Sequence, residues 1–286
     1  MIDFGLVGKK YGPISFVYTW KDVILYALSI GAQPDELPFI YENARGGLKV
    51  YPSYSMLMGV PLFLKFFKDM KVDLSRFIHG EQLIRLYRPI PPEGKTLVEG
   101  GVTNLYDKGK GALLIWRMKM MTEAGEPLAE TESGIFYLGE GGFGGDPGPK
   151  TEAFEPPEGT QPDFTVSPFI PENQAALYRL NGDINPLHVD PDFARRAGFS
   201  RPILHGLCTY GHAVRAILQK ACGGDVERFE EFKARLSGVV YPGDFLVTEG
   251  WKDGAERYLI RSRTDRGVVL SHAYAKVKIS EQARNL

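Results

Sequence analysis

An internal repeat constrains the fold of this 286-residue chain more than any other feature. Residues 25–34 (LYALSIGAQP) align without a gap with residues 177–186 (LYRLNGDINP), so that the Leu-Tyr-x-Leu start and the final proline coincide. In each half a longer apolar stretch with helical spacing follows, over 53–68 and over 203–222. A repeat on this scale predicts two copies of one structural unit.

A segment rich in glycine and proline separates the two copies. Residues 139–149 (GEGGFGGDPGP) and 155–159 (EPPEG) interrupt both helical and strand periodicity. We therefore expect a first unit over 1–145, a linker over 146–160 and a second unit over 161–286. This division also suits a chain that is long for one ordinary core.

Strand patterns follow the helical stretch in both halves. They cover 96–103, 112–120, 130–138, 245–251, 257–263 and 268–279. A long helix and an antiparallel meander each have one apolar face to bury, which predicts an α+β unit with its curved sheet wrapped around the helix. The two sheets could join edge to edge and so cover exposed strand edges. One large mixed sheet without a true repeat is the alternative.

Composition argues against several classes of function. A net charge of −1 gives no general attraction to nucleic acid or to an anionic membrane. No stretch approaches the roughly 18 apolar residues of a membrane span, and the N-terminus lacks a signal-peptide pattern. Cys208 and Cys222 have no metal-type spacing and fit a reducing compartment. Since the terminal sequence ARNL is also unlike the Ser-Lys-Leu address, we expect a cytoplasmic protein.

Functional residue types are most concentrated in residues 180–199 (LNGDINPLHVDPDFARRAGF). Asp190, which a proline follows, predicts the start of a short helix, and Gly198 predicts its end. Asp183 and His188 then lie on the loop before this helix, where five residues of separation allow both side chains to point to one place. A carboxylate and an imidazole that converge on a water can orient it and exchange protons with it as it attacks.

The alternative is that these residues only stabilise a turn, which is common for such a pattern taken alone. A second segment, 200–211 (SRPILHGLCTYG), favours the chemical interpretation. Gly206 permits close approach of a ligand, and a free N–H at a helix N-terminus stabilises an oxyanion that develops on a thioester carbonyl. We expect His205 to shape the site.

These segments also carry a family resemblance. Residues 173–188 (NQAALYRLNGDINPLH), continued by 202–211 (PILHGLCTYG), strongly resemble the (R)-specific 2-enoyl-CoA hydratases, also called hydratase 2, of the MaoC-like group. Looser similarity covers nearly the whole chain, including 141–145 (GGFGG). The resemblance implies a double hot-dog fold, in which a curved antiparallel sheet wraps around a long central helix in each half. It also implies reversible hydration of trans-2-enoyl-CoA to (3R)-3-hydroxyacyl-CoA in fatty acyl metabolism, without a metal or redox cofactor, since CoA is part of the substrate.

Residue roles follow from the same resemblance. It implies that Asp183 and His188 are the catalytic pair, that Asn185 supports them and that Gly206 supplies the oxyanion-binding N–H. It further implies a homodimer, whereas the sequence alone would permit a monomer because the two halves already pair with each other. We expect the substrate to contact Tyr178, His205, Arg201, Tyr54 and Met58. Cations available for the CoA phosphates are Arg179, Arg195, Arg196, Arg201, Lys220 and Lys233.

The first half departs from the motif. Gly31, Gln33 and Glu36 stand at the positions of the acidic residue, the amide and the histidine, so we predict one active site per chain. Changes at Gln33 or Glu36 should then affect binding at most. We expect the first half to bind the acyl chain, with Tyr51, Tyr54, Met56, Met58 and Phe63 as candidate lining residues or, alternatively, ordinary helix core.

Other functions remain open at this stage. An acyl-CoA thioesterase could use the same oxyanion device, and a hydratase acting on acyl carrier protein would carry the same motif. A non-catalytic acyl-CoA-binding subunit of this fold is a further alternative. A metal site at Asp183, His188 and His205 lacks the spacing of known metal motifs, so we expect none.

Overall fold

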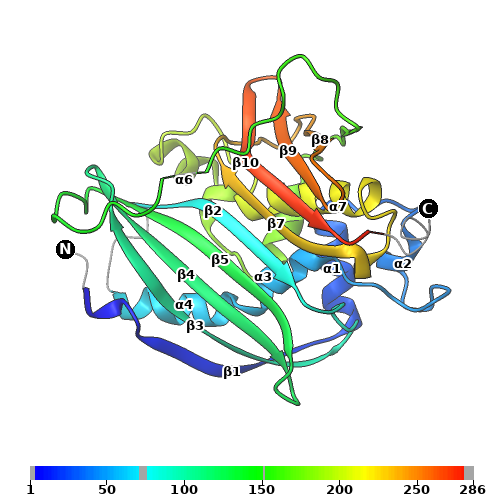
Figure 1. The fold of residues 1–286 in the computed structure, drawn as a ribbon, viewed down its shortest axis with the longest axis horizontal. Coiled ribbons are helices and arrows are strands. Elements are labelled where there is room, and N and C mark those ends of the chain that lie inside the picture. Colours follow the sequence, from blue (N-terminus) through cyan, green and yellow to red (C-terminus); the bar gives the residue numbers. More distant parts are fainter. Residues whose placement is uncertain (1–3, 71–75, 151, 280–286) are drawn as a thin grey trace.

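The computed structural model describes residues 4–70, 76–150 and 152–279. Ten strands within them form one sheet in the order β1-β3-β4-β5-β2-β7-β10-β9-β8-β6, and every neighbouring pair of strands is antiparallel. Read outward from the β2–β7 junction, the two halves have the same strand order. The sheet curves, and the long helices pack on its inner side (Figure 1).

The first half supplies five of the ten described strands. Its elements are η1 (Phe4–Leu6), β1 (Lys10–Tyr18), α1 (Trp20–Ser29), α2 (Leu37–Ile40), η2 (Pro52–Tyr54), α3 (Ser55–Met58), α4 (Val60–Met70), β2 (Phe77–Leu86), β3 (Gly94–Asp107), β4 (Gly111–Thr122) and β5 (Pro127–Leu138).

The second half repeats this plan with shorter strands and one longer helix. Its elements are β6 (Phe164–Val166), α5 (Gln174–Tyr178), η4 (Arg179–Asn181), η5 (Pro186–His188), α6 (Pro191–Arg196), α7 (Gly206–Lys220), η6 (Val226–Arg228), β7 (Phe229–Leu236), β8 (Val247–Lys252), β9 (Arg257–Thr264) and β10 (Gly267–Val277).

The two central helices differ in continuity. Helix α7 is unbroken, and every residue from 208 to 218 in it is buried. The helix that we predicted over 53–68 is instead divided at Gly59 into α3 and α4. Pro61 explains the break, because proline has no N–H to donate and its ring clashes with the carbonyl four residues earlier. The prediction of one long central helix in the first half was therefore wrong.

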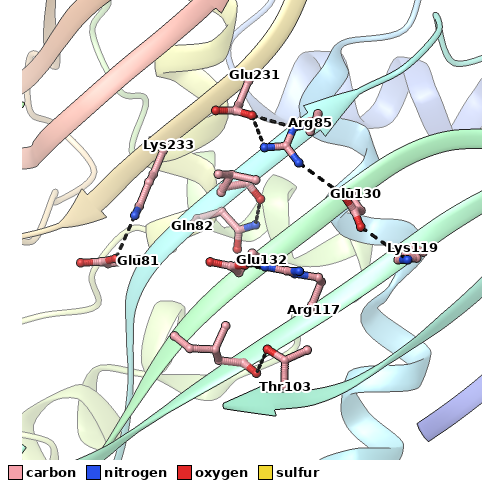
Figure 2. Close-up of polar contacts among 12 residues, drawn as sticks. Glu81, Gln82, Arg85, Thr103, Arg117, Lys119, Glu130, Glu132, Glu231 and Lys233 are labelled. Atoms are coloured by element: carbon pink, nitrogen blue, oxygen red, sulfur yellow. Dashed lines mark hydrogen bonds and ion pairs between the residues drawn. The ribbon is translucent and has the colours of Figure 1, made fainter. Parts of the chain in front are cut away.

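Pairing of β2 with β7 joins the two predicted sheets into one. Ion pairs cross this junction on the outer face: Arg85 lies 2.5 Å from Glu231, and Lys233 lies 3.7 Å from Glu81 (Figure 2). The Lys233–Glu81 pair is partly exposed and contributes up to about 1 kcal/mol, whereas the Glu231 side chain of the other pair is only 4% exposed. The backbone ladder, the shared core and this buried carboxylate together connect the halves.

One apolar core runs through both halves on the inner side of the sheet. In the first half Trp116 packs on Phe66 with ring centroids 4.4 Å apart, and in the second Tyr210 packs on Phe232 at 4.6 Å. The described residues of the predicted linker, 146–150 and 152–160, contain neither helix nor strand. Among the described helices, none has the length and apolar character that a bilayer span requires.

Candidate active site

The loop between η4 and α6 has the local structure that its sequence predicts. Gly182, with φ of +112°, ends η4 in a left-handed conformation. Asn185 caps η5 through its side-chain oxygen, which accepts from a backbone N–H at 3.1 Å. Asp190 caps α6 in the same way, and Gly198 follows that helix with φ of +90°. The predicted start and end of this short helix are confirmed.

The loop and the start of α7 bring three titratable side chains together. One potential hydrogen-bonding atom from each of Asp183, His188 and His205 lies within 4.8 Å of the others. Asp183 is half-buried, whereas the two histidines are buried. The backbone N–H of Asn185 donates to Asp183 Oδ1 at 3.3 Å. Asn185 therefore supports the carboxylate through its backbone, while its own side chain is used as the cap.

The protonation of His188 is set by its surroundings. Its Nδ1 lies 2.8 Å from the carbonyl oxygen of Ile203. Because a carbonyl oxygen only accepts, Nδ1 carries the proton and Nε2 keeps its lone pair. Burial lowers the pKa of His188, and the Ile203 carbonyl and the Asp183 charge offset only part of this effect. The imidazole is therefore neutral near pH 7 and can accept a proton.

His205 lies beside this pair and shapes it. Its Nε2 donates to the backbone carbonyl of Asp183 at 3.2 Å, and its ring stacks on His188 with centroids 3.7 Å apart and planes 27° apart. Burial, with the neighbouring His188, lowers the pKa of His205 to about 4. Each of the two histidines has one ring nitrogen in a hydrogen bond to a backbone carbonyl.

Tyr178 and Gly206 complete the wall of the site. The Tyr178 ring lies 4.8 Å from that of His205, and its buried hydroxyl has no partner in the described part of the chain. Gly206 is the first residue of α7, where N–H groups have no acceptor within the helix. A Cβ at Gly206 would lie 2.3 Å from Leu236 Cδ2. Glycine thus allows the helix start to pack closely against β7.

A cavity of about 60 Å³ lies in the first half next to this loop. Its lining residues are Met56, Gly59, Val60, Phe63, His79, Gln82, Met118, Thr131, Ser133 and Leu207. Three features place it beside the Asp183 loop and the start of α7. Leu207 directly follows Gly206, a Cβ on Gly182 would lie 3.6 Å from Val60, and the charge of Asp183 acts on the pKa of His79.

Two lining residues of the cavity, on β2, were not identified from sequence. His79 Nε2 lies 3.0 Å from Gln82 Oε1, which also accepts from Ser133 Oγ at 2.7 Å. The sequence pattern did not predict β2 as a strand, so no signal indicated that these polar groups would face the cavity.

The candidate binding residues are only partly brought together. Met56 and Phe63 line the cavity. Tyr54 and Met58 do not, because they are buried in the core, where Tyr54 packs between Tyr18 and Tyr26. Arg201 lies outside the cavity as well. It is half-exposed and interacts with Glu172 at 3.5 Å and with the Tyr241 ring. Lys233, one of the candidate phosphate-binding cations, is paired with Glu81 instead.

The corresponding loop of the first half makes structural contacts with helix α7. Glu36 lies 2.5 Å from Arg215 of α7, and it accepts from Tyr51 and Gln219 at 2.6 Å each. Burial raises the pKa of Glu36, but its bonds to Arg215 and Tyr51 outweigh this and leave the pKa below its usual value. A Cβ at Gly31 would lie 2.5 Å from His212 Cε1. Our expectation that Glu36 matters only for binding does not fit this buried ion pair.

Comparison with known proteins follows the same division into halves. The MFE-2 hydratase 2 N-terminal domain matches residues 16–139, and the MaoC like domain matches residues 152–272. A Dictyostelium discoideum protein named probable enoyl-CoA hydratase 2 is 38% identical over 281 residues, which cover 96% of this chain and 95% of that protein.

Solved structures agree with the sequence matches. The crystal structure of a MaoC-like dehydratase from Phytophthora capsici has a TM-score of 0.86 at 30% identity and covers 96% of both chains. A conserved Mycobacterium tuberculosis protein described as having a double hot-dog fold has a TM-score of 0.62 at 13% identity, over 95% of this chain and 96% of its own. The second likeness concerns the fold alone. This chain has a double hot-dog fold and belongs to the MaoC-like hydratase 2 family.

Proposed function

We propose that this chain is a hydro-lyase that adds water reversibly to trans-2-enoyl-CoA and forms (3R)-3-hydroxyacyl-CoA in fatty acyl metabolism. The observation that carries the proposal is the convergence of Asp183 and His188 beside the N-terminus of α7, in a chain whose relatives include a named hydratase 2. Asp183, His188 and Gly206, to which the resemblance assigns catalytic roles, lie close together in the chain's second half.

The geometry is suited to general acid–base catalysis. Asp183 and the Nε2 atom of His188 hold a water molecule and accept a proton as its oxygen bonds to C3 of the substrate. The pair returns a proton to C2, so both residues end in their starting protonation states. Negative charge that develops on the thioester oxygen meets the N–H of Gly206 and the positive end of the α7 dipole.

The cavity beside the site is the proposed acyl pocket of the first half. Most of its accessible lining is apolar, and it lies beside both Gly206 and the Asp183 loop, where carbons beyond C3 of the substrate would extend. CoA itself would remain outside, near half-exposed cations such as Arg201. The reaction needs no metal or redox cofactor, because only protons and water change places.

We also propose a cytoplasmic homodimer with no nucleic-acid or membrane partner. Exposed apolar side chains near the active-site loop, Leu180 at 62% and Ile184 at 67%, and the aromatic pair Phe169 and Phe245 offer surface for a second copy. Light scattering after size exclusion should give twice the chain mass, and cell fractionation should place the protein in the cytosol. A monomer or an organelle-bound protein would contradict these two points.

The decisive experiment is to incubate the protein with trans-2-enoyl-CoA, follow loss of the enoyl absorbance and identify the product by chiral analysis. We expect (3R)-3-hydroxyacyl-CoA from the wild type. In Asp183→Asn and His188→Ala we expect turnover to fall by about 10²-fold or more, with folding and acyl-CoA binding retained. Release of free CoA would indicate a thioesterase, and acyl-CoA binding without turnover would indicate a non-catalytic subunit. Full turnover in both variants would refute the site.

A further inference from the structure

The acyl pocket has a definite direction across the sheet. Its walls include His79 and Gln82 on β2, Thr131 on β5 and Met118 on β4. These three strands are neighbours in the order β2-β5-β4, and β2 lies at the junction with the catalytic half. The pocket therefore starts near the Asp183 loop and runs about 10 Å, two strand spacings, into the first half, where Met118 stands on the farthest of the three strands.

Met118 occupies a slot that two glycines leave open. A Cβ at Gly59, at the break between α3 and α4, would lie 2.3 Å from the Sδ and Cε atoms of Met118. A Cβ at Gly100 on β3 would lie 2.8 Å from its Cγ atom. The side chain thus extends between the helix break and the sheet. It is 5% exposed, and directly across the strand pair it faces Thr131.

The volume of the pocket limits the length of chain that it can hold. A water-sized group needs about 10 to 15 Å³ on this measure, so about 60 Å³ accommodates roughly four to six methylene groups beyond C3. A longer chain would have to displace Met118, whose three rotatable bonds make it adaptable but whose neighbours are buried.

We propose that Met118 sets the upper limit of acyl-chain length and that the enzyme prefers medium-chain enoyl-CoA of about eight carbons. This inference rests on the hydratase function proposed above. Met118 acts as a specificity-determining residue, because removal of its Cγ, Sδ and Cε atoms opens the end of the pocket without touching Asp183 or His188.

The test compares kcat/KM for trans-2-enoyl-CoA of about 4 to 14 carbons in the wild type and in Met118→Ala. A poorly accommodated methylene group changes kcat/KM by about tenfold or more. We therefore expect the wild type to lose at least about tenfold between 8 and 12 carbons. In Met118→Ala the value at 12 carbons should rise by about tenfold, while the value at four carbons changes by less than about threefold.

Met120→Ala is the matched control, since Met120 lies on the same face of β4, is 1% exposed and does not line the pocket. It should leave the optimum chain length unchanged. Gly59→Ala tests the opposite direction, because its Cβ would push the Met118 thioether into the pocket and move the optimum to shorter chains.

An optimum that is the same in the wild type, Met118→Ala and Gly59→Ala, or a wild type equally active at all lengths, would overturn the proposal. Absence of hydration at every length in the wild type would instead refute the proposed function.

Discussion

Replacement of Glu36 by glutamine should cost far more stability than an ordinary surface charge does. The side chains of Glu36 and Arg215 are only 9% and 7% exposed, so both charges have left water on folding. Glu36→Gln keeps the shape but leaves the Arg215 guanidinium without a counter-ion, a change that typically costs about 3 to 5 kcal/mol. Tyr51 retains a possible acceptor in the new amide, which keeps the expected loss near the lower end of that range, at about 3 kcal/mol.

Urea unfolding followed by far-UV circular dichroism measures this loss. The matched control is Asp253→Asn, which breaks an ion pair with Arg257 whose side chains are 38% and 44% exposed and should cost under about 1 kcal/mol. The double variant Glu36→Gln/Arg215→Met removes both charges and should recover much of the loss. If Glu36→Gln is no less stable than Asp253→Asn, Glu36 and Arg215 do not behave as a buried ion pair.

The remaining predictions concern the active site and its surroundings. Gly206→Ala should lower kcat by up to about 10²-fold, because the new Cβ would displace the start of α7 from Leu236. The double variant Gly206→Ala/Leu236→Ala should recover part of the activity. Equal activity of Gly206→Ala and the wild type would contradict this role of Gly206. Because burial lowers the pKa of His188, the pH–rate profile of kcat/KM should fall off on the acid side only below pH 6.5. A fall-off at or above pH 6.5 would show that the neutral imidazole does not limit activity. Burial and Arg215 lower the pKa of His212 to about 3. The free energy of unfolding should therefore decline as the pH falls below about 6.5, and His212 alone should account for about 2 kcal/mol of this decline at pH 5. Urea midpoints measured at pH 7 and pH 5 should differ less in His212→Leu than in the wild type.

The sequence predicts the loop that carries Asp183 and His188 better than it predicts the strands at the junction. Asp190 and Gly198 have strong local preferences, so the short helix and the loop before it could be located from residue types alone. Strand β2 was missed for two reasons: its register shifts between His79 and Glu81, and it carries charged residues that pair across the junction. Both features interrupt the alternation of apolar and polar residues that marks a strand in the sequence. Without β2, the polar groups at the start of the pocket could not be identified.

The break in the first central helix had a visible signal, since Pro61 lies inside an otherwise helical pattern. We expected a continuous helix because the apolar spacing extends past it. The pairing of Glu36 with Arg215 had no comparable signal. The two residues are 179 positions apart, and only the packing of the two halves brings them together.

The difference between the central helices accounts for the single active site that we propose in this repeated fold. Helix α7 is continuous and presents His212 and Arg215 to the first-half loop, where they fill the space opposite Gly31 and Glu36. An aspartate at Gly31 would place its Cβ 2.5 Å from His212 Cε1 and would have to adopt a φ of +81°, so a point reversal could not restore a second site. The helix that faces the catalytic loop is broken at Gly59 instead, and the break lines the cavity beside Asp183. The proposed single site in the second half and the proposed acyl pocket beside it thus follow from the same asymmetry in the two helices.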